Sequence, residues 1–301
     1  MAIDENIYER ILQKKKELEK LRPFNQGALK KLKDSFNVEL TYNSNAIEGN
    51  SLTLSETRLV LEEGITIGGK LLKEHFEVTN HQKAIEFVET LVKKPKIEEL
   101  DILNIHAIIL DRIDPENAGF YRKWGVKITG TNYTPPNPAK VPRLMQEIFS
   151  LFNSKTAELI ETGARIHMKF VDIHPFVDGN GRTARLLLNL YFMRHGYPPV
   201  IILRAERSKY IRSIVSAQTK GDFQPFINFI AKAVERSLDI YLDCLGTHPK
   251  EYLSLSEAAK FSKHSAEYLS LLSRTGKIEA VKFGRNWKIT REAIKEYEEK
   301  H

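Results

Sequence analysis

The sequence has little cysteine and no long apolar segment. Its one cysteine, Cys244, excludes an intramolecular disulfide framework and a cysteine-rich zinc site. No uninterrupted apolar run approaches the roughly 18 residues that would suggest a membrane span. The first twenty residues are charged and lack the apolar stretch of a secretory signal. These absences predict a cytoplasmic protein that makes no membrane contact.

The composition is that of an ordinary globular protein. Hydrophobic residues make up 42% of the 301 positions and charged residues 28%, which is enough apolar material for a sizeable core. The net charge of +7 favours anionic partners such as nucleotides or nucleic acid. An excess of basic residues also serves solubility, so the charge alone does not choose between these interpretations.

Apolar residues recur at helical spacing through most of the first 245 positions, which predicts a mainly α-helical protein. The expected helices cover about 4–22, 26–48, 54–63, 75–93, 98–111, 143–154, 156–174, 182–195, 206–219 and 222–245.

The segment 119–142 interrupts this helical pattern. Val126 and Ile128 alternate with polar residues, and three prolines follow within four positions, at 135, 136 and 138. Alternation followed by glycine and proline indicates a β-hairpin or an extended flap.

The last fifty residues have a different pattern. After a predicted linker at 246–252, the sequence favours two helices, two short strands and a terminal helix, which suits a small winged helix-turn-helix domain over 253–301. From 250 to 301 there are eleven basic and eight acidic residues, net +3. Lys282, Arg285 and Lys288 fall on the proposed wing, beside Trp287. We expect either DNA contact through the second helix and wing, or a role in protein docking or dimerisation.

The stretch "HPFVDGNGRTAR", from His174 to Arg185, carries the chemistry. A Gly-Asn-Gly turn directly precedes an apolar helix, so the first backbone N–H groups of that helix face outward as an anion site. Arg182 and Arg185 lie in the same helix end, where a cation opposes the helix dipole unless a polyphosphate binds there. Asp178 is a hard oxygen ligand suited to the magnesium of a nucleotide.

His174 completes this arrangement as a candidate base. It is held by the rigid Pro175, and a neutral imidazole beside a phosphate is able to accept a hydroxyl proton at physiological pH. Each feature alone is common in structural turns. Base, acid, Gly-Asn-Gly and two arginines within twelve residues together favour a functional site over a chance combination.

The stretch resembles the signature of the Fic-domain family, His-Pro-Phe-x-(Asp/Glu)-Gly-Asn-Gly-Arg-x-x-Arg, without departure. The segments "WGVKITGTNYTPPNPAKVP" and "HGYPPVIILRAERSKYIRSI" resemble the family's flap hairpin and the segment after the signature. Together the resemblance covers roughly 10–245. It implies a mainly α fold: a Fic-type helical bundle with a β-hairpin flap, followed here by the small winged-helix-like domain.

Membership implies transfer of AMP from ATP to a Ser, Thr or Tyr hydroxyl of a target protein or of the chain itself. By position, His174 is the general base, Asp178 holds Mg²⁺ on the phosphates, and Arg185 secures the γ-phosphate. The flap aligns the target segment by β-type pairing. The resemblance places the nucleotide against Thr129, Gly130, Thr131, Asn132, Tyr133, Asp178, Gly179, Asn180, Gly181, Arg182, Thr183, Ala184, Arg185, Tyr210 and Gln218.

The resemblance also bears on the reaction type. A kinase-like branch of the family places lysine where this chain has Gly181, so Gly181 argues for AMP transfer over phosphoryl transfer. Some members remove AMP with the same site, and both directions stay open. Homodimers are frequent in the family and are a further expectation.

An earlier stretch, "SNAIEGN" at 44–50, places Glu48 in the last turn of a predicted helix, where the dipole disfavours an anion. The stretch resembles the family's inhibitory motif, (Ser/Thr)-x-x-x-Glu-(Gly/Asn). The resemblance implies that Glu48 pairs with Arg185 and takes the place of the γ-phosphate, with Ser44 one turn earlier on the same face. The alternative is a solvated glutamate at a helix end.

We therefore expect an N-terminal helical region over 1–95, a catalytic core over 96–245, the linker, and the C-terminal domain. The leading hypothesis is an autoinhibited protein adenylyltransferase, a nucleotidyltransferase that uses ATP and Mg²⁺. The alternative is a DNA-binding regulator whose Fic region senses nucleotide.

Overall fold

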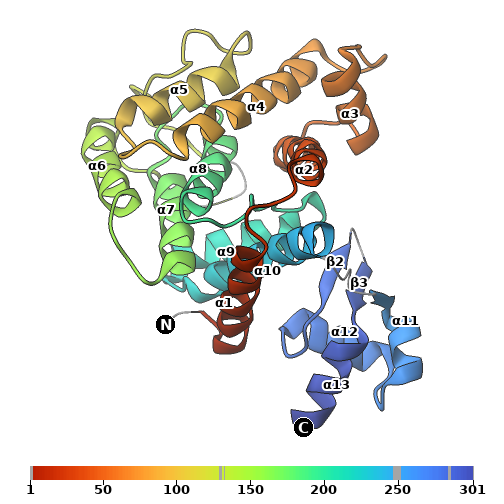
Figure 1. The fold of residues 1–301 in the computed structure, drawn as a ribbon. Helices are drawn as coiled ribbons and strands as arrows, with labels where there is room; N and C mark the ends of the chain where they lie inside the picture. Colours follow the sequence, from red (N-terminus) through yellow and green to blue (C-terminus); the bar gives the residue numbers. More distant parts are fainter. Residues whose placement is uncertain (1–2, 129–130, 132, 247–251, 284–285, 301) are drawn as a thin grey trace. The chain divides into compact units, whose positions relative to one another are not determined.

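The computed structural model describes residues 3–128, 131, 133–246, 252–283 and 286–300. It is mainly helical, as the periodicity predicts (Figure 1). The first ten α-helices are α1 (Glu5–Lys20), α2 (Gln26–Ile47), α3 (Leu54–Glu63), α4 (Leu72–Leu91), α5 (Glu99–Leu110), α6 (Val141–Phe152), α7 (Leu159–Ile173), α8 (Asn180–Arg194), α9 (Arg207–Lys220) and α10 (Gln224–Leu245). Among the described residues, none of the helices combines the length and apolar character that a membrane crossing requires.

The chain divides into two compact units, and both division points fall inside helices. One unit comprises 3–32 together with 231–301, and the other comprises 33–230. The predicted linker lies mostly at 247–251, outside the described residues. The functional boundaries predicted from the sequence therefore stay predictions.

Helix α8 is the central element of the unit formed by 33–230. Its apolar residues surround the helix instead of forming one stripe, and a helix of that kind must be buried on every side. From Arg182 to Phe192 every residue is buried. Helix α7 packs along it, and α4 and α5 also contact it. This packing fixes the start of α8 within a rigid scaffold.

The segment before α6 differs in detail from the predicted hairpin. Apart from 129, 130 and 132, which lie outside the described residues, positions 120–137 form no regular strand. The segment re-enters helical structure through Pro138–Lys140, a short 3₁₀ turn capped by the Asn137 side chain, which accepts from the Ala139 N–H at 2.9 Å.

In the other unit, residues 253–300 have a small core of their own. The elements are β1 (Leu253–Ser254), α11 (Leu255–Ala258), α12 (Ala266–Thr275), β2 (Val281–Phe283), β3 (Asn286–Ile289) and α13 (Arg291–Lys300). The antiparallel sheet has the order β1-β3-β2, with Leu253 opposite Ile289 and Val281 opposite Lys288. Its identity as a winged helix-turn-helix stays a prediction, and Arg285 of the proposed wing lies outside the described residues.

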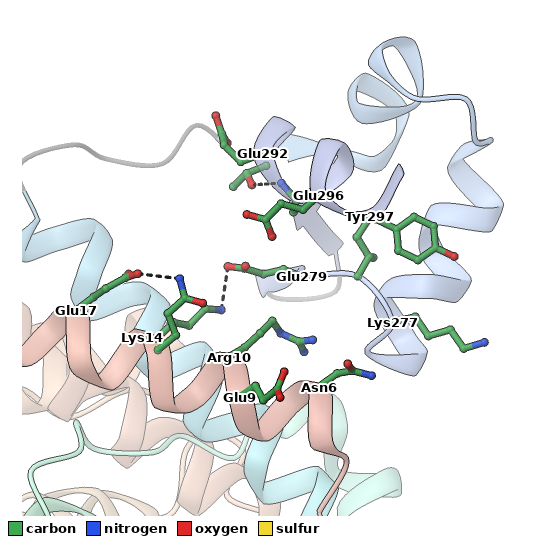
Figure 2. Close-up of a pocket in the computed structure, with 14 residues that line it drawn as sticks. Asn6, Glu9, Arg10, Lys14, Glu17, Lys277, Glu279, Glu292, Glu296 and Tyr297 are labelled. Carbon is green, nitrogen blue, oxygen red and sulfur yellow. Dashed lines mark hydrogen bonds and ion pairs between the residues drawn. The ribbon is translucent and has the colours of Figure 1, made fainter. Parts of the chain in front are cut away.

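A buried charge cluster lies in the same unit, between α1, α10 and the strand region. Lys14, 4% exposed, contacts Glu235 at 3.0 Å, Asp239 at 2.8 Å and Glu279 at 2.9 Å. Arg10 adds an ion pair with Glu235 at 2.6 Å. Figure 2 shows Lys14 and Glu279 pointing toward each other in this ion pair, and both line a cavity of about 600 Å³. None of the residues 174–185 lines this cavity.

Candidate active site

His174 stands where α7 ends. Its backbone has φ 49° and ψ 60°, the left-handed conformation that commonly ends a helix, and its N–H still donates to the Phe170 carbonyl at 2.9 Å. Pro175 follows and cannot continue the helix. The sequence therefore turns the chain sharply at the candidate base and directs it toward the start of α8.

The loop between the two helices is braced from within by Asn180. Its side-chain oxygen accepts from the Phe176 N–H at 3.0 Å, and its amide donates to the Phe176 carbonyl at 2.9 Å. Gly179 has φ 75°, a conformation that glycine adopts without strain. Because the Asn180 side chain is hydrogen-bonded to the Phe176 backbone, only the Asn180 backbone N–H is available to an anion.

His106 on α5 supports the same loop from outside. Its ring stacks on Phe176 with centroids 3.5 Å apart, and its two nitrogens lie 2.9 Å from the Asp178 carbonyl and 3.0 Å from the Gly119 N–H. Because an N–H faces Nδ1, that nitrogen must be the acceptor and Nε2 the donor. Burial lowers the pKa of His106 to about 4, which keeps this neutral form at physiological pH.

Helix α8 begins with two buried arginines. Arg182 and Arg185 are each 3% exposed. The Arg182 Nε and Nη1 atoms have no hydrogen-bond partner among the described residues, and its contacts to Glu77 and Asp178 are both 3.6 Å long. Unsatisfied cationic donors at a helix N-terminus are suited to a phosphate.

Arg185 in contrast is fully engaged by the end of α2. Its Nη2 donates to the Glu48 carboxylate at 2.8 Å and to the Ser44 carbonyl at 2.8 Å, and its Nε donates to the Ser44 hydroxyl at 3.0 Å. Burial, the largest single influence, acts to lower the pKa of Arg185, but the charges and hydrogen bonds of Glu48 and Tyr210 together outweigh it, so the pKa is raised. The structure thus brings together the two residues that the sequence pairs.

The Glu48 carboxylate also lies directly against Gly181. A Cβ atom added to Gly181 would collide with it. The carboxylate therefore occupies the space beside Gly181, in the first turn of α8. An anion from α2 stands where the sequence predicts a phosphate.

His174 itself is kept neutral by its surroundings. Burial, the largest influence, lowers its pKa, and the Arg122 charge acts in the same direction. The Val171 backbone and the carboxylates of Glu48 and Asp178 act the other way and are outweighed. A neutral imidazole is the form that accepts a proton.

Tyr210 and Gln218, the two predicted nucleotide contacts on α9, have different hydrogen-bond partners in the structure. The Tyr210 hydroxyl lies 2.8 Å from Nε2 of the buried His167, and burial raises the pKa of Tyr210 to about 12. The Gln218 amide donates to the Asp172 carboxylate at 2.9 Å, two residues before the candidate base. Thr183 and Ala184 are completely buried, so they support α8 from inside.

Two of the five flap positions are described. Thr131 accepts from the Tyr133 N–H through its hydroxyl at 3.1 Å, and the Tyr133 hydroxyl donates to the Asp172 carbonyl at 3.3 Å. These contacts fasten the described part of the flap to the end of α7. The predicted positions Thr129, Gly130 and Asn132 lie outside the described residues.

Asp178 is the one carboxylate predicted to hold a metal. Its side chain is 53% exposed, and one oxygen accepts from the Gly179 N–H at 2.6 Å. Within the described ranges, no three His, Cys, Asp or Glu side chains gather closely enough to hold a metal ion by themselves. One exposed carboxylate suits an ion that arrives on nucleotide phosphates, because Mg²⁺ keeps most of its ligands from phosphate and water.

Two residues that sequence reasoning does not single out also contact the loop. His106 is a lone histidine on an otherwise apolar helix, a pattern that more often belongs to a core. Arg122, whose Nε donates to the His174 carbonyl at 2.8 Å, looks like one of many surface arginines in the sequence. The only sequence signal is Arg122's position at the start of the predicted flap.

Comparisons with known proteins agree with this geometry. Residues 96–192 match the model of the Fic/DOC family. The Drosophila melanogaster protein named protein adenylyltransferase Fic is 39% identical over 254 residues, covering 83% of this chain and 51% of that protein. The chain thus spans about half the length of the curated relatives it matches.

Solved structures extend the likeness to the fold. A Fic domain-containing signalling protein from Bacteroides thetaiotaomicron is 30% identical with a TM-score of 0.71, covering 78% of this chain and 96% of that one. Fic-1 from C. elegans, residues 134–508, is 35% identical with a TM-score of 0.71, covering 78% and 72%. At this identity and coverage, with the signature at His174–Arg185 intact, the chain belongs to the Fic/DOC family.

Proposed function

We propose that this protein is an adenylyltransferase that transfers AMP from ATP to a hydroxyl of a protein. The observation that carries the proposal is the loop from His174 to Arg185, where a half-buried histidine of lowered pKa stands beside the N-terminus of α8 and two buried arginines. The name of the curated relatives, protein adenylyltransferase Fic, supports the same reaction.

In this reaction the target hydroxyl oxygen attacks the α-phosphorus of ATP. A new oxygen–phosphorus bond forms, the bond to the bridging oxygen of the β-phosphate breaks, and pyrophosphate leaves. His174 takes the hydroxyl proton as the bond forms. The backbone N–H groups of 179–181 and the Arg182 guanidinium stabilise the charge that develops on the phosphates.

Asp178 is the residue that would hold Mg²⁺, which supplies charge neutralisation on the phosphates when bound. Gly181 leaves the first turn of α8 open. A side chain there would fill the space that the Glu48 carboxylate now occupies. This openness favours transfer of the nucleotidyl group over the phosphoryl group.

The proposal includes autoinhibition by α2. The Glu48–Arg185 ion pair at 2.8 Å supports it, because the arginine cannot bind a γ-phosphate with the same Nη2 group while paired. Without a contact between Arg185 and the γ-phosphate, ATP binds in a pose unsuited to in-line attack. Removal of AMP by the same site is the second direction, and a water molecule would then replace the hydroxyl.

Labelled ATP tests the transfer. The Glu48→Gly protein is incubated with Mg²⁺ and either α-labelled or γ-labelled ATP, alone and with candidate targets. We expect α-labelled ATP alone to label protein. We expect no labelling by the double variant that carries His174→Ala together with Glu48→Gly. Label from γ-labelled ATP would indicate a kinase, and no label from either would remove the enzyme hypothesis in favour of nucleotide sensing.

A further inference from the structure

Arg122 is a buried cation at the start of the flap segment. Its neighbours two positions away in the sequence are exposed, Phe120 at 63% and Trp124 at 55%, yet Arg122 is 3% exposed. No carboxylate of the described residues forms an ion pair with it, and burial lowers its pKa. A buried arginine without a counterion is costly, so its hydrogen bonds must compensate.

Those hydrogen bonds all go to backbone carbonyls. The guanidinium donates to Trp124 at 3.0 Å and to Pro136 at 2.6 Å. It also donates to His174 at 2.8 Å and to Ile173 at 3.3 Å. The Arg122 backbone N–H donates to the Pro175 carbonyl at 2.9 Å.

The four side-chain acceptors fall into two groups. Trp124 and Pro136 lie on either side of the flap positions 129–133, twelve residues apart, and are called the flap ends here. Ile173 and His174 are the last residue of α7 and the candidate base. One rigid fork of five N–H donors therefore ties both ends of the flap to the base. Lysine carries its three donors on a single nitrogen and cannot span the same four carbonyls.

His174 depends on this contact for its unusual backbone. A non-glycine residue in the left-handed region is strained, and it persists where its surroundings fix it. Here the His174 N–H is held by Phe170 and its carbonyl by Arg122. These two contacts hold the backbone from which the imidazole projects.

From this arrangement we infer that Arg122 is a positioning residue, which joins the chain at Trp124 and Pro136 to the backbone of His174 so that a hydroxyl presented by the flap meets the base. The inference rests on the proposed transfer activity. Arg122 itself touches neither nucleotide phosphates nor the reacting hydroxyl in this role. It acts through the carbonyls of the flap ends and of His174.

The test uses Arg122→Lys and Arg122→Gln in the Glu48→Gly protein, with Arg143→Lys on the exposed face of α6 as the matched control. Transfer is measured with a fixed target, or as self-modification. Nucleotide binding is measured separately by titration of ATP, and amide exchange of 123–137 is followed by mass spectrometry without nucleotide.

We expect amides 123–137 to exchange at least about tenfold faster in both Arg122 variants, because the flap ends lose their anchor. We expect kcat to fall at least about tenfold while the dissociation constant of ATP changes less than about threefold. The control should match the parent in all three measurements. If Arg122→Gln fails to fold, Arg122→Lys, which keeps the charge, gives the answer.

Unchanged exchange at 123–137, or loss of kcat no greater than the loss of folded protein, would overturn the inference. Equal loss of ATP affinity and kcat would also overturn it, because Arg122 would then shape the nucleotide site itself. If the parent protein transfers no AMP, the proposed function fails, and the exchange measurement still decides whether Arg122 anchors the flap.

Discussion

Replacing Glu48 by glycine should raise AMP transfer, because it frees Arg185 for the γ-phosphate. The substitution removes the carboxylate that pairs with Arg185 at 2.8 Å and that lies against Gly181. The two Ser44 contacts to Arg185 do not involve the Glu48 side chain, so the guanidinium stays in place. The Nη2 hydrogen that Glu48 accepts is then available to the nucleotide, while the other Nη2 hydrogen stays on the Ser44 carbonyl.

The structure sets the size of the effect. A hydrogen bond to a charged group contributes about 1.5–3 kcal/mol to stability. The Glu48 side chain is 41% exposed, and solvent screening places its contribution at the low end, about 1.5 kcal/mol. A difference of about 1.4 kcal/mol is a factor of ten, so we expect transfer to rise about tenfold.

Melting experiments supply an independent readout. Without nucleotide, Glu48→Gly should melt at a lower temperature than the parent, because Arg185 is buried and has lost its counterion. ATP should restore the difference. A ligand at a hundred times its dissociation constant adds about 2.7 kcal/mol.

Glu63→Gly is the matched control, since Glu63 also ends a helix and precedes a glycine but is exposed on α3. It should leave transfer unchanged. Equal transfer by the parent and Glu48→Gly would refute the reasoning, as would an equal rise in Glu63→Gly. A rise in Glu48→Gly without stronger stabilisation by ATP would show that Arg185 is not the group released.

Four further predictions concern the candidate base and other parts of the chain. Because burial lowers the pKa of His174, the acid limb of kcat/KM in Glu48→Gly should lie below the ordinary histidine value of 6.5; a limb at or above 6.5 would contradict the assigned base. The pKa values of His81 and His167 are lowered by burial to about 3, so the unfolded state binds protons first as the pH falls below 6.5, and urea melts should show stability declining by about 1.4 kcal/mol per pH unit for each. Lys14→Met should cost about 3–5 kcal/mol in the same melts, because Glu235, Asp239 and Glu279 lose their shared cation; the exposed Lys16→Met should cost less than about 0.5 kcal/mol. For residues 253–301 the DNA hypothesis predicts duplex binding that weakens as salt rises, and no binding at low salt would leave protein docking, which the exposed Tyr268 and Leu271 of α12 suit.

Much of the fold follows from the sequence. Helical periodicity determines where α1 to α10 form, and the predicted ends agree with the structure within a few residues. The apolar run after Arg185 requires a buried helix, and the Gly-Asn-Gly turn places the first N–H groups of that helix, which lack intrahelical partners, directly before it. These are local properties, because periodicity and turn chemistry depend on neighbours within a few positions.

The family signature likewise identifies His174, Asp178 and Arg185 before any coordinates are known. The resemblance to the inhibitory motif also names Glu48 as the partner of Arg185, although 137 residues separate them; the sequence by itself shows only that a glutamate in the last turn of a helix is an electrostatic conflict. That conflict points to a cation elsewhere in the chain, and the resemblance identifies which one.

Only the tertiary structure decides how the site is held. His106 stacks under the loop and Arg122 joins the flap ends to His174, but neither role leaves a periodic or local signal. Their partners are backbone carbonyls and N–H groups, which every residue possesses. A contact made to the backbone places no constraint on the partner's side chain. Such a contact therefore leaves no pattern in the sequence and is seen only in the folded structure.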